Sequence, residues 1–116
     1  MSTNAELAQL FDRMGQLLEL LGANRFKVVA YQRAVRAIEG RTDDLAQLVN
    51  RDDPDDLAKL TKIDGIGEGI AQKIAEYVTT GQVEEYQELL DQVPPRLPEV
   101  LDVPGLGPKT VAMFWK

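Results

Sequence analysis

A glycine-rich pattern that occurs twice, forty residues apart, constrains the fold of this chain more than any other feature. The copies span Ile63–Ile74 and Val103–Phe114, and each reads apolar-x-Gly-apolar-Gly before apolar positions at helical spacing. Two glycines around one apolar residue allow a tight turn between helices, and we expect that apolar residue, Ile66 or Leu106, to anchor the turn in the core. The second glycine of each pair begins a helix whose free backbone N–H groups form an anion site.

The other segments also carry helical patterns. Apolar residues recur at intervals of three and four over residues 3–21. Further helices are predicted from after Asn24 to about Glu39, over residues 45–49, 57–60 and 83–93, and from the second glycine of the first pair to near Gly81. Thr3 and Glu6 have the spacing of a capping box, Thr42 or Asp43 is expected to cap the helix at 45–49, and residues 50–56 are expected to form a loop. Pro98 is expected to interrupt the chain. No segment alternates with a period of two, so we predict an all-α fold, a small helical bundle with two helical hairpins.

Composition excludes several classes of protein. The 116 residues include no cysteine and no histidine, which rules out disulfides, thiolate catalysis, His-dependent triads and Cys/His zinc sites. No apolar run approaches the length of a membrane span, and the N-terminus lacks a signal-peptide pattern. A dinucleotide-binding loop is disfavoured because no strand precedes the glycines, and no phosphate-binding Gly-Lys-Ser/Thr occurs. We therefore expect a soluble, intracellular protein that does not bind membranes. We also predict that it is a cytoplasmic monomer.

The charge is unevenly distributed. The whole chain has 13 basic and 19 acidic residues, a net charge of −6, yet five basic residues and one acidic residue lie within Arg25–Arg41. This segment is either a local cationic patch or an ordinary solvated helix face. The helix over residues 83–93 is expected to have an acidic exposed side, formed by Glu84, Glu85, Glu88 and Asp91.

Both glycine-rich copies resemble the helix-hairpin-helix motif, which binds the DNA phosphate backbone without reading sequence. The resemblance extends to the segment from Asn24 to Ala34, which contains Arg-Phe-x-x-x-Ala-Tyr-x-x-Ala, and to the order and spacing of both hairpins. Over almost its whole length the chain resembles the N-terminal region of family X DNA polymerases, the polymerase beta group, and most of all their bacterial branch.

This resemblance implies a lyase-type DNA-binding domain over residues 1–82 and the start of the fingers or thumb subdomain over residues 83–116. The first hairpin would hold the 5′-phosphate side of a DNA gap and the second the primer side. The polymerase domain, with its Mg²⁺ ions, would lie beyond the last helix, so that this fragment could not polymerise DNA. The implied DNA-binding residues are Lys27, Arg25, Arg33, Gly65, Gly67, Gly69, Gly105, Gly107, Lys109 and Thr110, with Arg36 extending the patch.

Two further features follow from the same resemblance. Each hairpin would hold a monovalent cation, K⁺ or Na⁺, on three backbone carbonyls, those of Thr61, Ile63 and Ile66 and those of Leu101, Val103 and Leu106. Lys73 matches the lysine with which some family members excise 5′-deoxyribose phosphate through a Schiff base, beside Tyr31 as a site tyrosine. Several expected groups are replaced here, since Phe26 stands for a histidine, Gly69 for a second lysine, Gln72 for a carboxylate and Glu85 for a basic residue.

Three functions therefore compete. The chain is a DNA-binding module of a gap-filling repair polymerase, or the same module with lyase activity, or an acidic helical domain that binds a basic protein partner. A tandem helix-hairpin-helix module of another DNA repair protein is a fourth alternative, which the tyrosine-bearing basic helix before the first hairpin disfavours.

Overall fold

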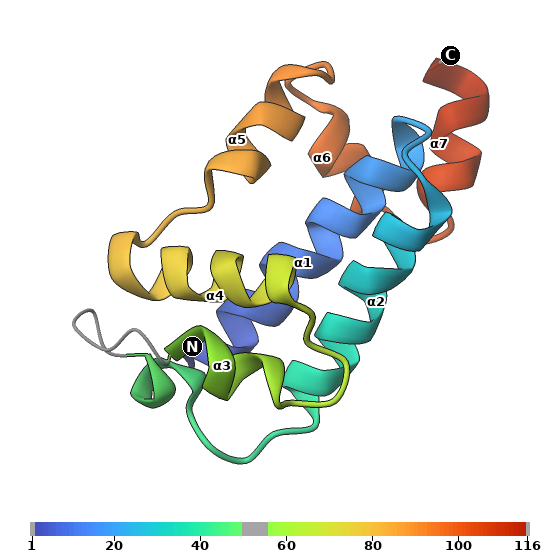
Figure 1. The fold of residues 1–116 in the computed structure, drawn as a ribbon. Coiled ribbons are helices and arrows are strands. Elements are labelled where there is room, and N and C mark those ends of the chain that lie inside the picture. The colour runs from blue at the N-terminus through green and yellow to red at the C-terminus, as the bar shows by residue number, and fades with distance from the viewer. Residues whose placement is uncertain (1, 50–55, 116) are drawn as a thin grey trace.

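The computed structural model describes residues 2–49 and 56–115, and this part of the chain contains helices and no strand, which confirms the all-α prediction. Helices α1 (Thr3–Leu20) and α2 (Arg25–Glu39) turn back on each other at Gly22 and form an antiparallel pair (Figure 1). The later elements are η1 (Leu45–Leu48, a 3₁₀ helix), α3 (Asp56–Thr61), α4 (Glu68–Thr80), α5 (Glu84–Asp91), α6 (Leu97–Leu101) and α7 (Pro108–Trp115).

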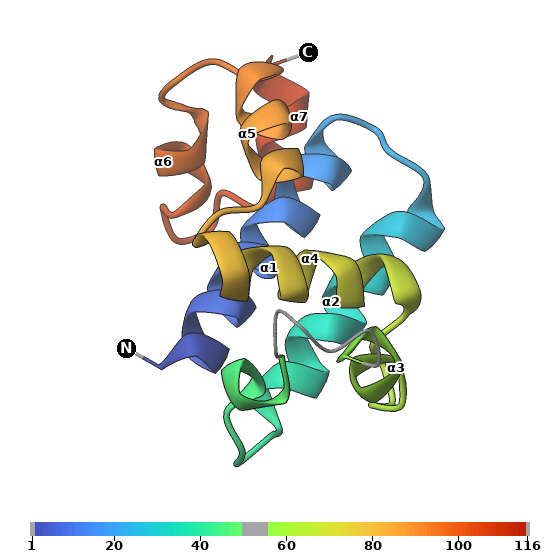
Figure 2. The same cartoon turned by 60° about the vertical axis from the view of Figure 1, so that its left-hand side comes forward.

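Helix α4 crosses the α1–α2 pair, and α3 leads into it near the end of α2 (Figures 1 and 2). Helices α5, α6 and α7 each contact α1. The buried apolar side chains form one cluster to which every element contributes, from Phe11 in α1 to Leu60 in α3 and Val111 in α7. This core contains residues from both sides of the predicted boundary at residue 83, and the division into two domains stays a prediction.

Arg13 fixes α6 against α1. Its guanidinium donates to the carbonyl oxygen of Pro98 at 2.6 Å and to the carboxylate of Asp102. Because arginine can bind two acceptors in a fixed geometry, this one side chain holds both ends of the short helix. The second hairpin is therefore attached to the same helix, α1, that packs against α2.

The helix starts differ from those predicted. The N-cap of α1 is Ser2, whose hydroxyl accepts from the N–H of Ala5 at 3.1 Å, so the capping box at Thr3 and Glu6 is wrong. Asp44 caps η1 by accepting from the N–H of Ala46 at 2.9 Å, in place of Thr42 or Asp43. Of the predicted loop at residues 50–56, all but the last residue lie outside the described residues.

The expectation for Pro98 is also wrong, because Pro98 lies in the first turn of α6. A proline is tolerated there because the N–H groups of the first turn have no partner within the helix. Within the part of the chain that the structure describes, no helix is both long and apolar enough to span a membrane.

Candidate nucleic-acid interface

The first hairpin joins α3 to α4, and Gly65 makes its tight turn. Gly65 has a φ of +94°, and a Cβ on it would lie 3.2 Å from the Cβ of Ala37 and 3.3 Å from the carbonyl oxygen of Arg33. Both the backbone conformation and the contact with α2 therefore require glycine. The next residue, Ile66, is buried and donates its N–H to the carbonyl oxygen of Ile63 at 3.0 Å. Ile66 anchors the turn in the core, as predicted.

The second glycine of this hairpin begins α4. Gly67 is the N-cap, and among the described residues no side chain accepts a capping hydrogen bond from the first turn of α4. A Cβ on Gly67 or on Gly69 would meet no atom within 4 Å, in contrast to Gly65. The start of α4 thus combines unpartnered backbone N–H groups with open space above the backbone, which is the geometry of a helix N-terminus that can receive an anion.

The second hairpin repeats the backbone of the first at the predicted shift of forty residues. Leu106 donates to the carbonyl oxygen of Val103 at 3.0 Å, and Val111 donates to that of Gly107 at 3.0 Å, as Ala71 donates to that of Gly67 at 2.9 Å. Gly105 has a φ of +85°, close to that of Gly65, but a Cβ there would meet nothing within 4 Å. The turn conformation is conserved within the chain, whereas the close contact with a neighbouring helix is particular to the first copy.

The two hairpins differ in their surroundings as well. Leu106 is only half-buried, while Ile66 is fully buried. In the second hairpin helix, Thr110 is half-buried, while Lys109 is exposed and has no ion-pair partner within the described residues. The second copy therefore presents its turn and its basic residue more openly.

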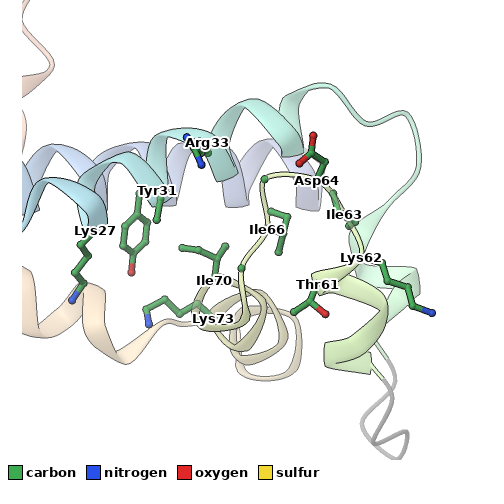
Figure 3. A pocket seen from close by; sticks show the side chains of 14 residues that line it. Lys27, Tyr31, Arg33, Thr61, Lys62, Ile63, Asp64, Ile66, Ile70 and Lys73 are labelled. Carbon is green, nitrogen blue, oxygen red and sulfur yellow. The ribbon is translucent and has the colours of Figure 1, made fainter.

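A pocket of about 700 Å³ lies between α2 and the first hairpin. Its walls include the predicted site residues Lys27, Tyr31, Arg33 and Lys73 together with the hairpin glycines. In Figure 3 the side chains of Lys27, Tyr31 and Lys73 point toward one another from α2 and α4, while Lys62 points away from them. The structure thus brings together residues that are more than forty positions apart in the sequence.

A carboxylate from α5 lies between the two lysines. Glu85 Oε1 is 2.9 Å from Lys27 Nζ, and Glu85 Oε2 is 2.8 Å from Lys73 Nζ. Burial alone would raise the pKa of Glu85, but hydrogen bonds and positive charge from both lysines outweigh it and hold the pKa below its ordinary value. The prediction that Glu85 belongs to the exposed acidic side of its helix is therefore wrong, although Glu84, Glu88 and Asp91 are exposed as expected.

Tyr31 forms the inner wall of the pocket. Its ring is 2% exposed and packs edge-on against Phe11, with 5.8 Å between ring centroids. Its hydroxyl is buried and has no hydrogen-bond partner within the described part of the chain. Burial raises the pKa of Tyr31, and the nearby charge of Glu85 raises it further, so the phenol stays protonated at neutral pH.

The cationic segment Arg25–Arg41 is only partly available for an anion. Arg25 lies 3.9 Å from a carboxylate oxygen of Glu19, and Arg41 pairs with Asp43 at 2.6 Å. Within the described residues, Arg33 and Arg36 have no ion pair, and both border a shallow hollow beside Gly65. The unpaired positive charge is therefore located next to the first hairpin.

The backbone carbonyls predicted to hold a cation lie in the two hairpin turns. The carbonyl oxygens of Ile63 and Val103 each accept one backbone hydrogen bond, which leaves one lone pair on each. The described residues contain no cluster of three or more carboxylates that could bind a divalent ion.

Sequence comparison places this architecture in a family. Residues 2–83 match the helix-hairpin-helix domain family, and residues 57–113 match a SAM-like helix-hairpin-helix tandem that includes both hairpins. The chain therefore belongs to the helix-hairpin-helix domain family.

A curated relative narrows the relationship. The DNA polymerase/3′-5′ exonuclease PolX of Bacillus subtilis (strain 168) is 32% identical over 111 residues, which cover 96% of this chain and 18% of that protein. This confirms the resemblance to a bacterial family X DNA polymerase and weakens the alternative of a tandem module from an unrelated repair protein. The chain spans about a fifth of the length of this relative.

Proposed function

We propose that this chain binds DNA through the phosphate backbone, without reading sequence, as the DNA-binding part of a family X polymerase. The first hairpin and its pocket receive the 5′-phosphate end of a gap, and the second hairpin contacts the strand on the other side. The observation that carries the proposal is that Lys27 and Lys73 converge in a pocket directly beside a hairpin whose helix start is open.

The two kinds of contact have different chemistry. Backbone N–H groups at a helix start bind internal phosphates of any sequence, which suits the open first turns after Gly67 and Gly107. Ammonium groups in a partly buried pocket favour the higher charge of a terminal phosphate. A net charge of −6 is compatible with this function because the contacts are local.

A titration of the 116-residue chain with gapped DNA tests the pocket. We expect tighter binding to a gap with a 5′-phosphate than to the same gap with a 5′-hydroxyl, and Lys27→Ala should remove most of this preference, about tenfold. Lys62→Ala is the matched control, since Lys62 lines the same pocket but points away from Lys27. It should weaken binding to both DNAs equally. Equal affinity of the unaltered chain for both DNAs would contradict the pocket, and no binding to either would favour the acidic protein-interaction domain.

The hairpin turns also fit a monovalent cation between protein and phosphate. Three carbonyl oxygens per hairpin, those of residues 61, 63 and 66 and of residues 101, 103 and 106, supply the oxygen donors that K⁺ or Na⁺ prefers. Bound there, the ion would offset the negative charge of the phosphate. The same titration in tetramethylammonium at equal ionic strength should show weaker binding, and unchanged affinity would rule the cation out.

Lyase activity is a second candidate, favoured by the position of Lys73 in the pocket. In this reaction Lys73 Nζ would attack the C1′ aldehyde of a 5′-deoxyribose phosphate, and water would leave as the Schiff base forms. The ion pair with Glu85 opposes this step, because the attack needs an uncharged amine. Borohydride trapping on DNA with a 5′-deoxyribose phosphate tests it, since a covalent adduct that disappears in Lys73→Ala would support the lyase. Absence of any adduct would exclude it.

A further inference from the structure

Glu85 does not line the pocket, but its carboxylate contacts two lysines that do. The carboxylate comes from the first turn of α5, while the two lysines it contacts come from α2 and α4. The side chains of Glu85 and Lys73 are each 21% exposed and that of Lys27 is 49% exposed. The bridge is thus partly buried on one side and accessible to solvent on the other.

The carboxylate takes up the contacts that an incoming phosphate would need. Its two oxygens lie at hydrogen-bond distance from the two ammonium groups, one oxygen on each. A phosphate bound between the same groups would place its oxygens at similar distances. Both anions would occupy the same position between the two ammonium groups, so they compete for it.

We propose that Glu85 is an internal competitor for the terminal phosphate, which occupies the Lys27–Lys73 site in the free protein and leaves it when DNA binds. This inference rests on the proposed function of the pocket and adds a specificity-determining residue to it. Glu85 lowers the affinity for a 5′-phosphate by the free energy needed to break its two ion pairs.

The Glu85 carboxylate can move away from the two lysines without losing all of its stabilisation. It lies in the first turn of α5, where a negative charge is favoured by the helix dipole even in solvent. The start of α5 is attached independently of Glu85, because the N–H of Glu84 donates to the carboxylate of Glu76 in α4 at 2.9 Å. Rotation of the Glu85 side chain alone can therefore open the site while α5 stays in place.

Glu85→Gln tests the competition because glutamine keeps the shape and removes the charge. Removing two partly exposed ion pairs should raise affinity for the gap with a 5′-phosphate by about fivefold to tenfold. Affinity for the gap with a 5′-hydroxyl should change no more than it does in Glu84→Gln. Glu84 is the matched control, since it is the neighbouring residue, is exposed and forms no ion pair within the described chain.

The outcomes separate this inference from the proposed function. If the unaltered chain prefers the 5′-phosphate and Glu85→Gln shows the same preference, Glu85 does not compete and the pocket stands. If neither protein distinguishes the two DNAs, the pocket binds no terminal phosphate and both proposals fail. A preference that grows in Glu85→Gln but not in Glu84→Gln supports the competition. Glu85→Ala, checked for folding by circular dichroism, is a second variant and should show the same gain.

Discussion

The glycines of the first hairpin have different reasons to be glycine. Gly65 combines a φ of +94° with close contacts to Ala37 and to the backbone of Arg33, while Gly67 has an ordinary φ of −84° and open space where a Cβ would lie. The fold requires glycine at position 65, whereas glycine at position 67 leaves room for a ligand. Sequence alone places both glycines in one motif and does not separate these two reasons.

Two alanine substitutions make this difference measurable. Gly65→Ala should lower the free energy of unfolding by about 2–3 kcal/mol, because it adds backbone strain to a tight contact. Gly67→Ala should change it by less than about 1 kcal/mol and should weaken DNA binding, because the new methyl group occupies the open space over the helix start. Urea denaturation and the gapped-DNA titration check the two effects. Equal destabilisation by both substitutions would show that Gly67 is also required by packing.

Among the secondary-structure elements, local sequence patterns predicted which segments are helical better than they predicted the residues at which the helices begin and end. The apolar spacing of α1 and α2 and the repeated hairpins were predictable because they depend on residues within a few positions of each other. The spacing of Thr3 and Glu6 predicts a cap at Thr3, but Glu6 instead accepts from the hydroxyl of Tyr77 at 3.2 Å. A contact with a residue in α4 decides this helix start, and such contacts cannot be derived from local sequence.

The short helix α6 is a second element that local sequence patterns did not predict. Pro98 predicts an interruption of the chain, whereas the structure has a helix before the second hairpin, as α3 precedes the first. Arg13 holds this helix through Pro98 and Asp102 from 85 and 89 positions away. The forty-residue repeat nevertheless relates the two helices, since Thr61 at the end of α3 corresponds to Leu101 at the end of α6.

At the scale of the whole molecule, the distribution of charge changes when the chain folds. The segment Arg25–Arg41 is strongly basic in the sequence, but acidic residues from α1, from the segment after α2 and from α5 approach three of its five basic residues. Lys27 and Lys73 were predictable as site residues from the family resemblance. The ion pairs of Glu85 with these lysines were not, because they depend on where the first turn of α5 lies relative to α2 and α4.

The Glu85 bridge should also make the stability of the whole chain depend on pH. The pKa of Glu85 is lowered in the folded protein, so the folded state binds its proton less readily than the unfolded state. The stabilisation is then fully present above the ordinary glutamate pKa of about 4.3 and is lost as the pH falls through the lower folded value. Because both ion pairs are partly exposed, we expect about 1 kcal/mol from them at pH 7.

Comparison with Glu85→Gln isolates this contribution from the other carboxylates. At pH 7 the unaltered chain should be more stable than the variant by about 1 kcal/mol, and the difference should shrink as the pH is lowered from about 5 to 3. Urea denaturation at several pH values measures it, with Glu84→Gln as the matched control for loss of a charge in the first turn of α5. A constant difference across this range would mean that Glu85 stabilises the chain by packing and that its two ion pairs do not contribute to the free energy of unfolding.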